Sequence, residues 1–160
     1  MNRVPALTIA VLAAVAPLFA LGTERFVGLA PCALCLWQRW PYWVAAALAV
    51  LAALTRGRWL LSLAGLAVLV SAGIAALHIG VEQGWWPSPL PSCQAPTATL
   101  GLSVDDMLKA MSAKPDKPCD APSFLIPGLP VSMAQMNFVY AAVVGGLALR
   151  WSVQQGRRGV

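Results

Sequence analysis

The chain has 160 residues, of which 59% are hydrophobic and 11% are charged, and its formal net charge is +5. This composition lies outside the range of soluble domains of this size and indicates helices that face lipid. The basic residues punctuate apolar runs and form no patch with interleaved aromatics, which argues against a nucleic-acid partner.

The first predicted element is a membrane span over residues 4–22, a run without charged residues. Its length suits the roughly 20 residues that a helix needs to cross hydrocarbon. A cleaved signal peptide is the competing interpretation, because Arg3 precedes the run and small residues follow near its end. The run is longer than the roughly 7–15 apolar residues of a signal peptide, which favours the span.

A predicted outer loop over residues 23–35 leads to the second span, residues 36–54, and ends in the pair Cys32 and Cys35. Arg39 follows four residues later, so on a helix it shares a face with Cys35. A cation there favours the thiolate over the thiol and makes the sulfur more reactive. If Pro31 is the first helical residue, the positive end of the helix acts in the same sense.

The third span is predicted over residues 59–79 and the fourth over 131–149, with a second outer loop, 80–130, between them. This loop holds nine of the thirteen prolines and must be mostly extended or turning. The pattern from Ser103 to about Ala113 predicts one short amphipathic helix. It would lie on the membrane surface or pack against the loop itself.

Basic residues predict the orientation. Six lie in short segments on the side of the two termini: Arg3, Arg56, Arg58, Arg150, Arg157 and Arg158. The denser basic side faces the cytoplasm. We therefore predict a single all-α domain over residues 1–160, a bundle of four transmembrane helices. Both termini would be cytoplasmic and all four cysteines would lie outside, where disulfides persist.

The four cysteines allow three disulfide connectivities and two main interpretations. Bracing suits Cys93 and Cys119, since closing a loop of that length stabilises by about 3 kcal/mol in the entropy model. It suits Cys32 and Cys35 badly, because closing a two-residue gap contributes little, and there we favour redox chemistry. Zinc is a weaker alternative, since the second cysteine pair is not closely spaced. Covalent haem is weaker still, because no histidine follows the Cys-x-x-Cys, and we predict no metal.

If both pairs are redox-active, they can exchange, and a two-electron acceptor in the bilayer is most simply a quinone. Three runs resemble one family, disulfide bond formation protein B (DsbB): Cys32-Ala-Leu-Cys35-Leu-Trp-Gln-Arg39, the run from His78 to Trp86 that leads to Pro-Ser-Cys93, and Pro118-Cys119-Asp120. The resemblance covers nearly the whole chain.

The resemblance implies a protein-disulfide:quinone oxidoreductase of the bacterial inner membrane that reoxidises a periplasmic DsbA-like dithiol protein. Cys93 would be the sulfur that reduced DsbA attacks, with Cys119 as its partner. Cys32 would exchange with this loop pair. Cys35 would face ubiquinone or menaquinone and form a thiolate–quinone adduct or charge-transfer species, and Arg39 would stabilise the thiolate and help to hold the quinone ring.

Other positions leave the quinone site open to alternatives. His78 could bind near the quinone and handle protons, or it could pair with Glu82 as a structural contact, which we favour. The family run Ser-Met-Ala-x-Trp-Asn has Met136 in place of tryptophan, and Gln38 stands where some members have an acid.

Two other functions compete with the thiol oxidase. One is a four-span membrane protein without enzymatic activity, whose disulfide-braced loop binds a partner. The other is an enzyme like vitamin K epoxide reductase, which shares the chemistry but matches the cysteine placement less well.

Overall fold

The computed structural model describes residues 3–90, 93, 117–126 and 128–157. These residues form four long helices and one short π-helix: α1 (Val4–Gly22), η1 (Thr23–Val27), α2 (Ala33–Thr55), α3 (Arg58–Glu82) and α5 (Met133–Arg157). Within the described ranges the only β-type pairing is an isolated bridge between Phe124 and Ser132. The predicted amphipathic helix, Ser103 to Ala113, lies outside the described residues.

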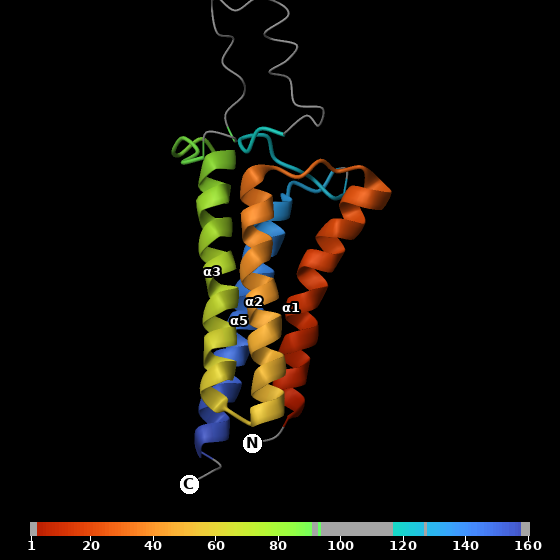
Figure 1. The fold of residues 1–160 in the computed structure, drawn as a ribbon. Coiled ribbons are helices and arrows are strands. Elements are labelled where there is room, and N and C mark those ends of the chain that lie inside the picture. Colours follow the sequence, from red (N-terminus) through yellow and green to blue (C-terminus); the bar gives the residue numbers. More distant parts are fainter. Residues whose placement is uncertain (1–2, 91–92, 94–116, 127, 158–160) are drawn as a thin grey trace, which may run out of the picture.

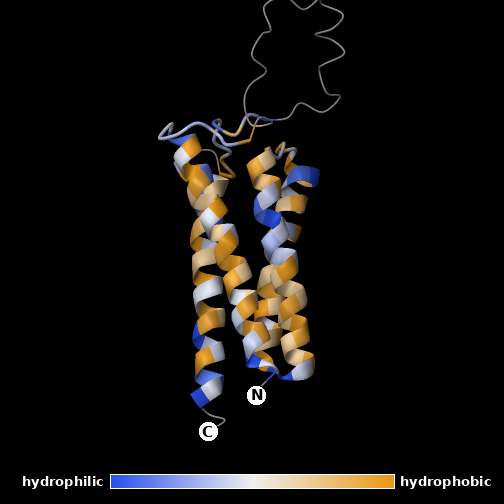
Figure 2. Ribbon diagram, turned by 60° about the vertical axis from the view of Figure 1, so that its left-hand side comes forward, coloured by the Kyte–Doolittle hydropathy of each residue, from blue (hydrophilic) through white to orange (hydrophobic). Residues whose placement is uncertain are grey.

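The four long helices stand side by side, with both termini at one end and the cysteine-bearing loops at the other (Figure 1). Three of them are long and apolar enough to cross a membrane, over Val4–Val27, Arg58–Glu82 and Met133–Arg157. Helix α2, with 23 residues, is nearly as long, but its first turns carry Gln38 and Arg39. Apolar residues cover most of the helical surface, and polar ones gather toward the ends (Figure 2). The fold is the predicted four-helix membrane bundle.

Two details at the loop end differ from what the sequence suggested. The polar link after the first span is helical, because η1 continues α1 as far as Val27, and Gly28 caps it with a φ of 75° that glycine adopts without strain. Pro31 is not the first residue of α2. Cys32 is the N-cap, and its Sγ accepts a hydrogen bond from the backbone N–H of Cys35 at 3.2 Å. This cap places both sulfurs at the N-terminal end of the helix.

Small residues allow the helices to approach closely. On α3, a Cβ added to Gly65 would meet the Cβ of Ala148 at 3.0 Å and the carbonyl oxygen of Gly145 at 3.1 Å. On α5, Ala141 and Gly145 are buried four residues apart, whereas Gly146 is exposed. Close backbone contact of this kind drives helix association where no water is available to be expelled.

Candidate redox site

The four cysteines gather at the loop end of the bundle. Cys32, Cys93 and Cys119 belong to one buried apolar cluster, and Cys35 packs against it. They come from the start of α2 and from two separate parts of the second loop, so only the folded chain brings them together. The cluster places the two pairs near each other, as sulfur exchange between them requires.

Cys93 and Cys119 form a disulfide, as the resemblance implied. Their Cα atoms are 4.8 Å apart, and the backbone N–H of Cys119 donates to the carbonyl oxygen of Cys93 at 3.1 Å. Both residues are buried. The disulfide therefore joins the two arms of the second loop against the end of the bundle.

Cys32 and Cys35 are free thiols whose sulfurs lie 2.6 Å apart. The hydrogen bond from the Cys32 thiol lowers the pKa of Cys35 to about 7, and the nearby Arg39 charge has a smaller effect in the same direction. The same hydrogen bond, together with burial, raises the pKa of Cys32. The pair therefore loses one proton readily, from Cys35, which lies just before the predicted membrane span.

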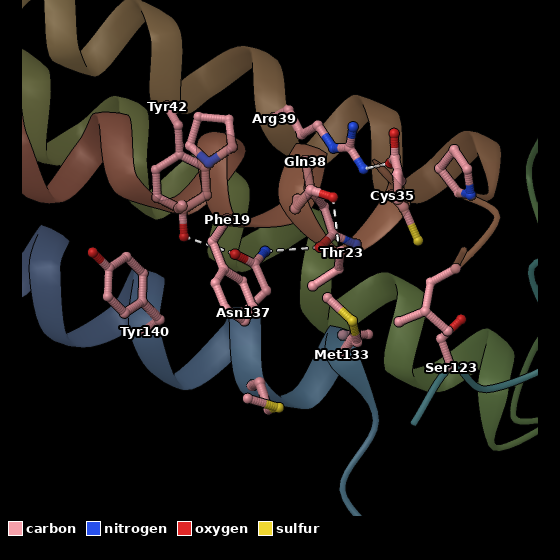
Figure 3. A pocket seen from close by; sticks show the side chains of 18 of the residues that line it. Phe19, Thr23, Cys35, Gln38, Arg39, Tyr42, Ser123, Met133, Asn137 and Tyr140 are labelled. Atoms are coloured by element: carbon pink, nitrogen blue, oxygen red, sulfur yellow. Dashed lines mark hydrogen bonds and ion pairs between the residues drawn. The ribbon is translucent and has the colours of Figure 1, made fainter. Parts of the chain in front are cut away.

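Beside Cys35, α1 leans away from α2 toward the loop end of the bundle (Figure 1), and a cavity of about 360 Å³ opens there. Its wall is mostly apolar and includes residues of α1, α2 and α5. Figure 3 shows Cys35, Gln38 and Arg39 on the α2 side, facing Met133 and Asn137 of α5. Cys35 therefore lies in the wall of a mostly apolar cavity at the loop end of the bundle.

Arg39 lines this cavity and forms an ion pair with Glu24 of η1. Its Nε is buried and has no hydrogen-bond partner among the residues that the structure describes. The sequence predicted Arg39 as a partner of the thiolate but missed Glu24, which stood in the segment read as a polar link. Glu24 compensates the guanidinium charge at the membrane boundary, and the Nε remains available to an acceptor in the cavity.

His78 is nearly fully buried but is absent from the cavity wall. Its Nε2 lies 3.6 Å from Cys32 Sγ and 3.2 Å from the Cys119 carbonyl oxygen. The contact with Glu82 that we favoured is longer, 3.8 Å between Nε2 and Oε1. The other carboxylate oxygen of Glu82, Oε2, accepts a hydrogen bond from the Ser132 hydroxyl. The ring thus lies beside the cysteines, away from the predicted quinone contact.

A polar network that we did not predict lies in the wall of the cavity. Asn137 accepts a hydrogen bond from the Tyr42 hydroxyl at 2.7 Å and donates to Oε1 of Gln38 at 2.7 Å (Figure 3). The other end of the Gln38 amide faces His78. Uncharged amides inside apolar spans are costly unless they are hydrogen-bonded. The presence of Gln38 and Asn137 in such spans could therefore have predicted that each has a partner.

The donor atoms do not form the four-thiolate zinc site that we weighed, because Cys93 and Cys119 are joined to each other. In the described part of the chain, one group has metal-binding side chains close enough together to share an ion. It consists of Cys32, Cys35 and His78, whose ligand atoms lie within 4.8 Å of one another.

Comparison with known proteins identifies the family. The family model "Disulfide bond formation protein DsbB" matches residues 2–151. Comparison with curated proteins and with solved structures gives no match. The match covers all four cysteines and all four long helices except the last turns of α5, and on this basis the chain belongs to the DsbB family.

Proposed function

We propose that the chain is a quinone-dependent thiol oxidase that reoxidises a periplasmic DsbA-like dithiol protein. Membership of the DsbB family implies a thiol oxidoreductase, and the chain is a multi-pass membrane protein. The observation that carries the finer proposal is the position of Cys35, a low-pKa sulfur in the wall of an apolar cavity.

The cavity suits a quinone ring. Its mostly apolar wall matches a lipid-soluble molecule, and the partnerless Nε of Arg39 is a buried donor that a ring carbonyl would satisfy. A bound quinone would supply an acceptor for two electrons and two protons. Arg39 and Cys35 are the residues that would hold it, and ubiquinone and menaquinone both have the required carbonyls.

The electrons would reach Cys35 by two exchanges. After the partner has reduced the loop pair, the Cys119 thiolate attacks Cys32, the Cys119–Cys32 bond forms and the Cys32–Cys35 bond breaks, releasing the Cys35 thiolate. The Cys93 thiolate then attacks Cys119, which restores the loop disulfide and releases Cys32 as a thiolate. The loop dithiol has become a disulfide and the helix disulfide has become a dithiol.

The same proposal places the protein in the bacterial inner membrane with its cysteines in the periplasm. The termini lie together at one end of the bundle (Figure 1), opposite the start of α2 where the cysteines cluster, which agrees with the distribution of basic residues. The loop disulfide would then lie on the periplasmic side of the membrane.

Filling the cavity tests this function. Ala20→Trp places a large ring in the cavity wall and should raise the KM for added ubiquinone about tenfold or more in detergent-solubilised protein that oxidises reduced DsbA. Leu18→Trp is the matched control, because Leu18 is exposed on the same helix and outside the cavity wall. Equal KM values in both variants, or no quinone-dependent oxidation by the wild type, would leave the partner-binding loop as the better explanation.

A further inference from the structure

His78 stands between the two cysteine pairs near the end of α3, where its side chain is 3% exposed. One ring nitrogen, Nε2, faces the sulfur of Cys32 at 3.6 Å and the carbonyl oxygen of Cys119 at 3.2 Å. The histidine therefore touches the helix pair and the loop pair through the same atom. What this contact can do depends on whether Nε2 carries a hydrogen.

A chain of hydrogen bonds behind the ring answers that question. The Ser71 hydroxyl donates to the backbone carbonyl of Gln38 at 2.9 Å, so its oxygen is left to accept from Nδ2 of Asn137 at 3.2 Å. The Asn137 amide nitrogen also lies 2.7 Å from Gln38 Oε1, which accepts from it. The Gln38 amide nitrogen is thereby directed at Nδ1 of His78, at 3.0 Å. An amide nitrogen only donates, so Nδ1 accepts.

The other side of the ring leads to the same assignment. A neutral imidazole whose Nδ1 accepts must carry its hydrogen on Nε2. The Cys119 carbonyl oxygen, which only accepts, faces this nitrogen. The backbone carbonyl of Gln38 at one end of the network and that of Cys119 at the other therefore require the same tautomer, with the hydrogen on Nε2.

The nearby charged groups leave this hydrogen to the cysteines. Glu82 Oε1 is 3.8 Å from Nε2, which is beyond hydrogen-bond distance. The other carboxylate oxygen, Oε2, accepts a hydrogen bond from the Ser132 hydroxyl. The Lys117 ammonium donates to the carbonyl oxygen of Pro122 and to the Ser123 hydroxyl. The Nε2 hydrogen is shared between the Cys119 carbonyl and the Cys32 sulfur.

We infer that His78 is a positioning residue for exchange between the cysteine pairs, which donates its Nε2 hydrogen to the Cys32 sulfur and does not act as a base toward the quinone. Resting on the proposed function, the inference assigns His78 to the step in which Cys32 leaves Cys119 as a thiolate. A donor to the leaving sulfur stabilises the charge that develops there. In the reduced pair, the same donor strengthens the hydrogen bond from the Cys32 thiol to the Cys35 thiolate.

The position of the hydrogen is directly measurable, because His78 is the only histidine in the chain. Nitrogen NMR of the ¹⁵N-histidine-labelled full chain, purified without a histidine tag and reduced at pH 7, should show one ring nitrogen with a hydrogen and one without. Selective coupling to the ring carbons should assign the hydrogen to Nε2. A hydrogen on Nδ1, or on both nitrogens, would overturn the inference.

The exchange rate supplies a second test, made without quinone. Oxidised protein receives one equivalent of reduced DsbA, and acid quenching, alkylation and peptide mapping follow the appearance of free Cys32 and Cys35. His78→Phe should slow this transfer about tenfold or more, and His78→Gln, which can place an amide donor near the same point, should recover most of the rate.

The outcomes of this second test are distinct. Ser62→Ala, at the opposite end of α3, is the matched control and should transfer at the wild-type rate. Transfer in His78→Phe at the wild-type rate, or equally slow transfer in His78→Gln, would overturn the inference alone. Absence of transfer in the wild type would overturn the proposed function and the inference with it.

Discussion

The two cysteine pairs lie in one apolar cluster, yet their surroundings differ in kind. The loop pair is a closed disulfide, held by backbone hydrogen bonds to Cys93 and Cys119. The helix pair is open, and around it are a helix N-terminus, a histidine and an arginine. Cys32 is as buried as Cys93 and Cys119, whereas Cys35 is half-buried, so burial alone does not separate the two pairs. The polar groups that face each sulfur make the difference.

Removing the Cys35 sulfur, which lies at the cavity, should have the largest effect on turnover and should separate the roles of the two pairs. Cys35→Ser should abolish quinone-dependent oxidation of reduced DsbA, because no thiolate remains next to the cavity. The loop disulfide should still form, since Cys93 and Cys119 make no bond to Cys35. Oxygen-free turnover assays and alkylation mapping would check both points, and sustained turnover in this variant would refute the role of the helix pair.

Changing the cation should have the next largest effect. Arg39→Ala removes the donor that faces the cavity and leaves the half-buried Glu24 without its ion-pair partner, so we expect the KM for quinone to rise about tenfold to a hundredfold. Arg39→Lys should lose less, because it keeps the charge. Titration with quinone at fixed dithiol concentration measures this, and identical KM values in all three forms would contradict the role of Arg39.

The third test concerns the Cys32 thiol, whose hydrogen bond lowers the pKa of Cys35. In reduced wild-type protein, the alkylation rate of Cys35 should rise with pH about a midpoint near 7, since its pKa is about 7 and the thiolate is the reactive form above it. Cys32→Ala removes the largest cause of that lowered pKa, so the midpoint should move upward toward the ordinary value of a cysteine. An unchanged midpoint would show that Arg39 or the helix end determines it.

The smallest expected effect lies in the polar network. Tyr42→Phe removes the hydroxyl that donates to Asn137 and should lower the free energy of unfolding by about 1 kcal/mol, with little change in turnover. Thermal unfolding in detergent measures the loss. Turnover reduced as strongly as in Arg39→Ala would mean that the network acts in catalysis.

Much of the fold was predictable because long apolar runs in a sequence predict membrane spans. The predicted spans 59–79 and 4–22 lie within the helices observed, and the fourth, 131–149, was placed too early because α5 runs from Met133 to Arg157. The π-helix η1 was missed, since its polar residues read as a link although they continue the preceding helix.

The candidate site was predictable in its chemistry but not in its contacts. The spacing of Cys32 and Cys35 marked the redox pair without structural information. The approach of His78 to both pairs depends on where α3 ends relative to the second loop, a distance in space that sequence spacing does not encode. Likewise, nothing in the sequence order connects Asn137 to Gln38, which meet because α2 and α5 pack together.

The most direct test of the central claim is alkylation mapping of all four cysteines during turnover in sealed, inverted and right-side-out membrane vesicles, with and without added quinone. Without quinone, reduced DsbA should leave Cys35 free and open to a reagent that enters from the periplasmic side. With quinone, Cys35 should return to the disulfide with Cys32 in each cycle. A Cys35 that never becomes free, or one modified only from the cytoplasmic side, would contradict the account.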